Sequence, residues 1–317
     1  MIKISVWNGD LSDGYLRAIT QLGADCIDFG SAASFPGVKE QGYPDLDAVV
    51  KIRRKIQSWG LDINRVTLPT ISTGYLDDEA GHFHDVENAA KALRIFSEVG
   101  IPIARQRFEW DNMPSLTRTY RAIHRGGYLS RGEYSHWSGY ETPDQASWQH
   151  RWERIASVYQ KLVPTAEACG IKLAIHPSDT PYPGTPFDSL GFHRVLDAFP
   201  SKNVGFLYCI GTRAEAGGSS LVLDELNNFG RKGRLFTVHF RNVRGSLATS
   251  GGFEEVLLDD GDMNMFTILR MLHSVGFEGC VNPDHIPAIE GDIGHVSQGL
   301  AYSIGYIKAL FAALSVL

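Results

Sequence analysis

Two spacings of apolar residues alternate along this chain. Short apolar runs rich in β-branched and aromatic residues predict strands, and longer segments that repeat an apolar position every three to four residues predict amphipathic helices. Eight strands are predicted, at Ile2–Val6, Cys26–Phe29, Asp62–Thr67, Ile103–Phe108, Lys172–Ile175, Val204–Tyr208, Leu235–Phe240 and Gly279–Pro283.

Each predicted strand is followed by a predicted helix. Ser12 and Asp45 stand where a side chain can cap the first turn, and glycines follow several helices where a left-handed residue ends them. A βα unit repeated in this way predicts an α/β fold, a closed (β/α)8 TIM barrel forming a single domain over residues 1–317. The predicted helices are Ser12–Leu22, Asp45–Trp59, Val86–Val99, Trp148–Cys169, Phe187–Phe199, Leu221–Phe229, Met263–Val275 and Val296–Leu317.

One irregular stretch, at about 109–147, interrupts this order after the fourth strand. It holds several aromatic residues, which argues against disorder. Loops of this length are usually functional, so the stretch is predicted to cover a site or to pack on a partner subunit.

Four residues with metal-binding side chains stand at the ends of the last four predicted strands: His176, Cys209, His239 and Asp284. In a parallel barrel these ends meet at one rim, where two imidazoles, a thiolate and a carboxylate would make a divalent-metal site. Taken singly, each residue is more often a core or turn residue. Their matching positions on consecutive strands favour the metal site.

Composition limits the classes of binding partner that we expect. The chain has 317 residues, 43% of them hydrophobic, and a net charge of −6, with no basic patch for nucleic acid. The sequence has no secretory signal and no apolar run long enough for a membrane span, and its four cysteines lack CxxC spacing. We therefore expect a cytoplasmic protein with reduced thiols, a small-molecule ligand and no nucleic-acid or membrane partner. The apolar C-terminal helix closes the barrel or makes a homodimer contact.

Several longer motifs resemble, in order and spacing, those of the mannonate dehydratase family within the xylose-isomerase-like barrels. They are Leu173–Pro181, Cys209–Thr212, His239–Val243, Asp260–Met263 and Pro283–His285. The resemblance implies a lyase that removes water from D-mannonate to give 2-keto-3-deoxy-D-gluconate, a step of hexuronate breakdown. It also implies that Mn²⁺, or another divalent ion such as Mg²⁺, Fe²⁺ or Co²⁺, binds His176, Cys209, His239 and Asp284.

Three residues are candidates for catalysis. By resemblance, Tyr302 matches a C-terminal tyrosine of the family, and His285 lies beside a predicted ligand. Arg241 comes two residues after His239 and so projects to the same side, where it could hold a substrate carboxylate or acidify a tyrosine. The alternatives are a salt bridge to a loop carboxylate for Arg241 and plain helix packing for Tyr302.

The chain departs from the family after the second strand. Family members carry a His-His-Ile-Pro-like motif there, whereas this chain has Ala32–Pro36. The substrate is therefore open and could be another aldonate. Arg105 and Arg107 end the fourth strand, where either could attract an anionic substrate. Two alternatives are a sugar isomerase or epimerase of the same superfamily, which usually uses carboxylate ligands, and a barrel that binds a sugar acid without turning it over.

Overall fold

The computed structural model describes residues 1–79, 81–109, 120–121, 125–127, 129–130, 144–177, 190–292 and 294–316. Eight parallel strands close a barrel in the order β1-β12-β9-β8-β7-β4-β3-β2. They are β1 (Lys3–Trp7), β2 (Cys26–Asp28), β3 (Asp62–Thr67), β4 (Ile103–Arg105), β7 (Lys172–Ile175), β8 (Val204–Cys209), β9 (Leu235–His239) and β12 (Cys280–Asn282).

The predicted barrel and its strands are confirmed. Each predicted run overlaps one observed strand, and the strand interiors are buried, as in β8, where every residue is buried. The register is regular, for example Ile103 with Lys172 and Arg105 with Ala174 between β4 and β7. A parallel register places the residues that follow these strands at the same end of the barrel.

The helices follow the prediction closely, with one exception. Ser12 and Asp45 accept hydrogen bonds from the amides of Tyr15 and Ala48, and Gly23 ends the first helix with a φ of 93°. The main helices are α1 (Asp13–Leu22), α3 (Leu46–Gln57), α5 (Asp85–Glu98), α6 (Gln145–Cys169), α7 (Leu190–Ala198), α8 (Ile210–Arg231), α10 (Met265–Ser274) and α11 (Gln298–Leu314).

The exception is α8, which begins directly after β8 rather than at Leu221. Its first half is rich in glycine and serine, which weakens the helical signal, and Gly218 interrupts the helix with φ 73° and ψ −167°. Shorter elements complete the chain: η1 (Ala32–Ser34), α2 (Val38–Gln41), α4 (Thr73–Leu76), β5 (Tyr120–Arg121), β6 (Leu129–Ser130), β10 (Asn242–Ser246), α9 (Leu247–Ser250) and β11 (Gly252–Val256).

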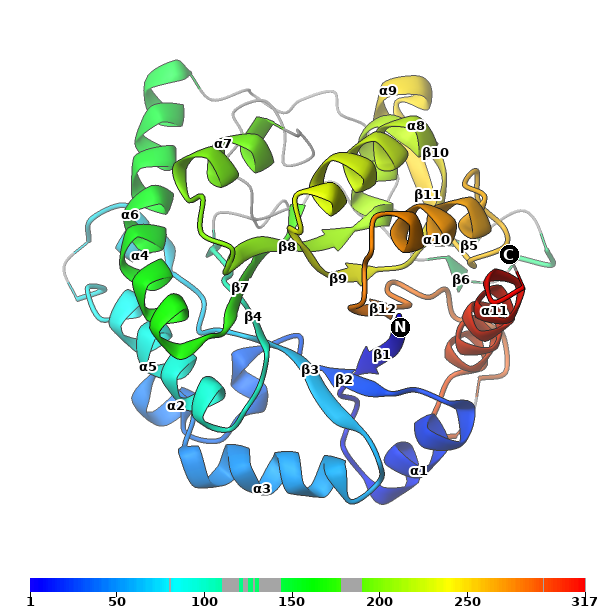
Figure 1. Ribbon diagram of the computed structural model, residues 1–317, viewed down its shortest axis with the longest axis horizontal. Coiled ribbons are helices and arrows are strands. Elements are labelled where there is room, and N and C mark those ends of the chain that lie inside the picture. The colour runs from blue at the N-terminus through cyan, green and yellow to red at the C-terminus, as the bar shows by residue number, and fades with distance from the viewer. Residues whose placement is uncertain are drawn as a thin grey trace. The chain divides into compact units, whose positions relative to one another are not determined.

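Contacts divide the chain into two compact units, and two of the boundaries between them fall inside β2 and inside β8. The first unit comprises residues 1–26, 113–140 and 208–317, and the second comprises 27–112 and 141–207. In the first, α1 packs against α11, and β10 pairs with β11 in an antiparallel hairpin (Figure 1). In the second, α5 packs against α6 (Figure 1).

Two predictions about organisation stay predictions. Most of the irregular stretch at 109–147 lies outside the described residues, so its role as a cover or partner contact is not tested. The assignment of residues 1–317 to a single domain is likewise not tested. No described helix combines the length and apolar character that crossing a membrane requires.

Candidate metal centre

The four predicted ligands lie where the sequence placed them, at the carboxyl ends of neighbouring strands. Cys209 ends β8, His239 ends β9, His176 directly follows β7, and Asp284 comes two residues after β12. All four are at least nine-tenths buried. A buried ionisable group needs a partner or a metal, because desolvation of an isolated charge is costly.

Three of the four predicted ligands have metal-binding atoms that lie close to one another. One atom each of His176, Cys209 and His239 lies within 4.8 Å of the other two, a potential metal-binding group among the described residues. Asp284 instead lies against His239, with its Oδ2 3.1 Å from Nδ1 of the imidazole. Nitrogen and sulfur ligands of this kind suit borderline divalent ions.

Cys209 is held by two hydrogen-bond donors. The Thr212 hydroxyl donates to its sulfur over 3.1 Å and the Arg241 Nε over 3.3 Å. The residue also stands immediately before α8, at its amino-terminal cap position. A cation, a hydroxyl donor and a helix start together stabilise a thiolate, the form of cysteine that binds metals.

Arg241 is the centre of a buried polar network. Its Nη1 forms ion pairs with Glu215 and, over 2.8 Å, with Glu255, and its Nη2 donates to Thr212 over 3.0 Å. A side chain at Gly211 would bring its Cβ within 2.4 Å of the guanidinium carbon, so only glycine permits this approach. The side chain of Arg241 is only 4% exposed.

Electrostatics keep Asp284 ionised. Burial alone would raise the pKa of its carboxyl group, but the charges of His285, His239 and Arg241 outweigh burial and hold that pKa well below its usual range. Trp7, the last residue of β1, donates from Nε1 to Oδ1 over 3.2 Å, and its ring meets the His239 ring edge-on at 5.5 Å. The carboxylate is therefore oriented as well as charged.

His285 lies between two carboxylates. Burial would lower the pKa of its imidazole, but Asp284 and Glu255 together raise that pKa to about 9, so the ring is protonated at neutral pH. Its Nδ1 is hydrogen-bonded to Glu255, and its Nε2 is 3.5 Å from Asp284. The backbone φ of 49° puts this residue in the left-handed region, a strained conformation that is concentrated at functional sites.

Family membership rests on a match over more than half of the chain. Residues 132–317 match the model of the D-mannonate dehydratase (UxuA) family. The chain belongs to the mannonate dehydratase family. A mannonate dehydratase of Halalkalibacterium halodurans is 30% identical over 172 residues, which are 52% of this chain and 50% of that relative. The chain thus spans about half the length of the curated relatives it matches.

Solved structures agree on the fold. The crystal structure of mannonate dehydratase from Streptococcus suis serotype 2 matches 99% of this chain and 95% of its own, with a TM-score of 0.80 and 22% identity. A xylose isomerase domain protein from Planctomyces limnophilus matches all of this chain and 99% of its own, with a TM-score of 0.64 and 13% identity. At these identities the matches support the barrel fold alone.

In this mannonate dehydratase family member, two of the three predicted catalytic residues lie beside predicted metal ligands and the third does not. Arg241 and His285 adjoin the ligands through Cys209 and Asp284, whereas Tyr302, which is 38% exposed on α11, faces Arg125 and Asp259. Burial and Asp259 raise the pKa of Tyr302, and Arg125 opposes them. The catalytic assignments of all three stay predictions.

The sequence interpretation missed several residues around the site. Glu215 and Glu255 pair with Arg241, Thr212 contacts Cys209, and Trp7 contacts Asp284. Of these residues, only Trp7 could have been found from the sequence, because it is the last residue of β1 just as His239 is the last residue of β9. The partners of Arg241 lie 26 and 14 residues away from it, too far for a local pattern to indicate.

Proposed function

We propose that this protein catalyses the metal-dependent dehydration of a sugar acid, D-mannonate or a related aldonate, to the 2-keto-3-deoxy acid. The observation that carries the proposal is the convergence of His176, Cys209 and His239, within a family named for this reaction. A xylose-isomerase-like isomerase would usually present carboxylates where this chain has His176 and Cys209.

The donor set fits a divalent ion. The family resemblance makes Mn²⁺ the first choice, with Mg²⁺, Fe²⁺ or Co²⁺ as alternatives. His176, Cys209, His239 and Asp284 would hold it. A bound divalent ion would supply positive charge to the substrate carboxylate and so stabilise the anion that forms when the neighbouring carbon loses its proton. Asp284, ionised and fixed by Trp7, is suited to complete the set.

The residues of the chain must also move two protons. One leaves carbon 2 of the acid, and one must reach the hydroxyl that departs from carbon 3, because hydroxide is a poor leaving group. His285 adjoins the predicted ligand Asp284, with its Nε2 3.5 Å from that carboxylate, and is our candidate to donate the second proton. Loss of water gives an enol, and its tautomer is the 2-keto-3-deoxy acid.

Arg241 influences this reaction through its contact with the predicted ligand Cys209. All three of its guanidinium nitrogens contact protein groups, namely Cys209, Thr212 and the two glutamates. Such contacts fix the orientation of a ligand and tune its basicity. We therefore assign Arg241 a positioning role, in place of the substrate contact that its spacing from His239 had suggested.

The decisive experiment measures water loss directly. Metal-depleted protein is reconstituted with Mn²⁺, Mg²⁺, Fe²⁺ or Co²⁺ and incubated with C5 and C6 aldonic acids, and 2-keto-3-deoxy product is quantified. Reconstituted protein should form product and depleted protein should not. Isomerised sugar without water loss would instead establish the isomerase alternative, and a protein that binds no metal would overturn both.

Tyr302→Phe tests the remaining catalytic candidate. If Tyr302 carries a proton, the variant should retain its metal while turnover falls by about 10² to 10⁴. Normal turnover would leave the residue a packing role on α11. Metal content separates a lost proton carrier from a damaged site.

Three wider expectations accompany this function. The reaction would belong to hexuronate breakdown, the protein would work in the cytoplasm, and it would form a homodimer. Sedimentation of the purified protein tests the last of these, since a monomer at all concentrations would exclude it.

A further inference from the structure

A cavity of about 260 Å³ opens within the second compact unit, at the carboxyl ends of β2, β3 and β4. Small residues line one wall, among them Gly30, Ala32 and Ala33, which follow β2. A water molecule occupies about 30 Å³ of liquid, so the cavity has room for roughly nine waters, less than the ~300 Å³ of a complete drug-sized pocket. It therefore suits part of a small ligand.

One end of the cavity carries the positive charge of Arg107, which follows the strand that pairs with β7. Arg107 lines the cavity two residues beyond Arg105, which pairs with Ala174, and His176 lies two residues beyond Ala174. The backbone amide of Gln106 donates to the Ala174 carbonyl over 3.2 Å, a hydrogen bond that belongs to the pairing of Arg105 with Ala174. Paired residues of neighbouring parallel strands lie about 5 Å apart on the same face.

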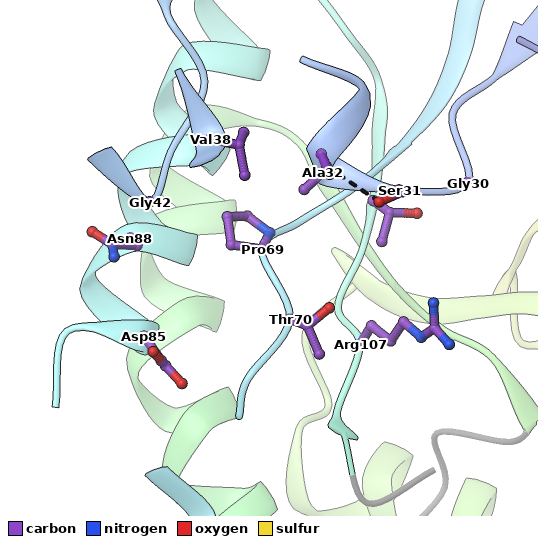
Figure 2. A pocket seen from close by; sticks show the side chains of 12 residues that line it. Gly30, Ser31, Ala32, Val38, Gly42, Pro69, Thr70, Asp85, Asn88 and Arg107 are labelled. Atoms are coloured by element: carbon purple, nitrogen blue, oxygen red, sulfur yellow. Dashed lines mark hydrogen bonds between the residues drawn. The ribbon is translucent and has the colours of Figure 1, made fainter. Parts of the chain in front are cut away.

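The charge of Arg107 is available to a ligand. The guanidinium is half-buried, and no carboxylate of the described ranges forms an ion pair with it. Thr70 and Ser31 also line the cavity, and Figure 2 shows Thr70 beside the backbone end of Arg107, with the guanidinium extending away from it. A planar guanidinium matches a carboxylate geometrically through two parallel hydrogen bonds.

The opposite end of the cavity carries a negative charge. Asp85 and Asn88 lie three residues apart on α5, and Figure 2 shows them across the cavity from Arg107. The Ser72 amide and hydroxyl donate to Oδ2 of Asp85, which fixes the carboxylate in place. Asn88 packs over Gly42, where a side chain would bring its Cβ within 2.2 Å of the amide nitrogen. This end accepts hydrogen bonds from hydroxyls and repels anions.

We propose that this cavity holds the hydroxylated chain of the sugar acid, with Arg107 binding its carboxylate end and Asp85 selecting a neutral, hydroxylated tail over an acidic one. The proposal rests on the proposed function for the identity of the acid. It follows from two opposite charges at the two ends of one small polar cavity, where Arg107 follows β4 and β4 pairs with β7, the strand that His176 follows. Neither Arg107 nor Asp85 belongs to the metal-ligand set.

The test compares two acids that differ only at the far end. Calorimetric titration of the Mn²⁺-loaded protein measures binding of D-mannonate and of its 1,6-diacid. The native protein should bind the mono-acid at least about tenfold more tightly, because the diacid would place a second carboxylate against Asp85. Equal affinities, or tighter binding of the diacid, would overturn the selection by Asp85.

Two variants test which residue discriminates between the two acids and which one binds both. Asp85→Asn should reduce the discrimination between the acids to about twofold or less while mono-acid affinity changes little. Arg107→Gln should weaken both acids by about 10-fold to 100-fold, since each loses its charged hydrogen bonds at the near end. Arg94→Gln removes one cation from the exposed face of α5 and serves as the matched control, with no change expected.

A further variant covers the case in which Arg107→Gln fails to fold. Ala33→Leu fills the cavity from an exposed wall position and should weaken the mono-acid by at least about tenfold through steric exclusion. Variants that all bind like Arg94→Gln while the enzyme still dehydrates mannonate would refute the cavity alone. Binding that depends on Arg107, in a protein that releases no water from any acid, would refute the dehydratase assignment and leave the cavity in place.

Discussion

Two arginines that follow strands of this barrel are used in opposite ways. Arg241, after β9, is buried, and all of its guanidinium nitrogens contact Cys209, Thr212, Glu215 or Glu255. Arg107, after β4, is half-buried at a cavity wall, with no ion pair to any carboxylate that the structure describes. Residue type and strand-end position are the same, so the surroundings make the difference.

This difference indicates separate roles for the region around Arg241 and the cavity beside Arg107. A fully bonded cation has one conformation and cannot change partners, which suits a group that holds a metal ligand in place. A cation without an internal partner can exchange water for an incoming anion. The region around Arg241 is thus organised in advance, and the cavity beside Arg107 is completed by its ligand.

Removing the thiol of Cys209 should have the largest effect. Cys209→Ala should lose the metal and at least about 100-fold of activity, since even residues behind a metal ligand contribute 10-fold to 100-fold. Metal per chain and product formation are measured on the same preparation. Cys169→Ala, which removes a thiol from α6, is the control. A Cys209→Ala protein with full metal content would remove the thiol from the ligand set.

The second largest effect is expected when the ion pairs and hydrogen bonds of Arg241 are removed. Arg241→Met leaves Glu215 and Glu255 buried without their main cation, at a cost of about 3–5 kcal/mol in the free energy of unfolding. Metal affinity should also fall by about 10-fold to 100-fold. Denaturant unfolding and metal titration measure the two effects.

Arg213 offers a matched comparison for that variant. It pairs with Glu225 in an equally buried ion pair. Arg213→Met should lose similar stability but keep its metal affinity. Equal loss of metal affinity in both variants would reduce Arg241 to a structural residue.

A third ion pair, exposed to solvent, gives a much smaller effect. Arg53 contacts Asp62 over 2.9 Å, with 25% and 43% of the two side chains exposed. Burial would raise the pKa of Asp62, but Arg53 and the Ile63 amide outweigh it and lower that pKa below 3.8.

The sign of the pH dependence follows from this lowered pKa. The pair stabilises the fold above the unfolded pKa and loses its contribution as the pH falls through the folded value. Asp62→Asn should therefore cost at most about 1 kcal/mol at pH 7, and the difference should shrink below pH 4. A pH-independent difference between the two proteins would show that the effect is not ionic.

The smallest effect on stability is expected at Arg107. Because its side chain forms no ion pair within the described part of the chain, Arg107→Gln should change the free energy of unfolding by no more than about 0.5 kcal/mol. Thermal unfolding without ligand measures this. A loss comparable to that of Arg241→Met would show that Arg107 is structural and would erase the contrast between the two arginines.

Local patterns were enough to predict most of the fold. Every barrel strand was predicted, because buried parallel strands are apolar throughout and are separated by helices of another period. The first half of α8 was missed since its glycines and serines are weak helix formers. The hairpin β10–β11 was also missed, because its two five-residue strands contain few apolar residues.

The candidate ligands were predictable for a related reason. His176, Cys209, His239 and Asp284 each follow a strand whose end the sequence marks, so their common position could be inferred before any distance was known. The partners of Arg241 could not be inferred, because Glu215 lies within α8 and Glu255 within β11, and neither element was predicted at that position.

By itself, the sequence determined the order of strands and helices, the barrel and the residue types at its rim, since each depends on local periodicity and strand ends. Only the tertiary structure decided what those residues do to one another. It placed Arg241 against Cys209 rather than in the open, set Asp284 against His239 and Trp7, and put opposite charges at the two ends of the cavity beside Arg107. Such contacts join residues far apart in the chain, and their energies depend on burial and distance, which no local pattern encodes.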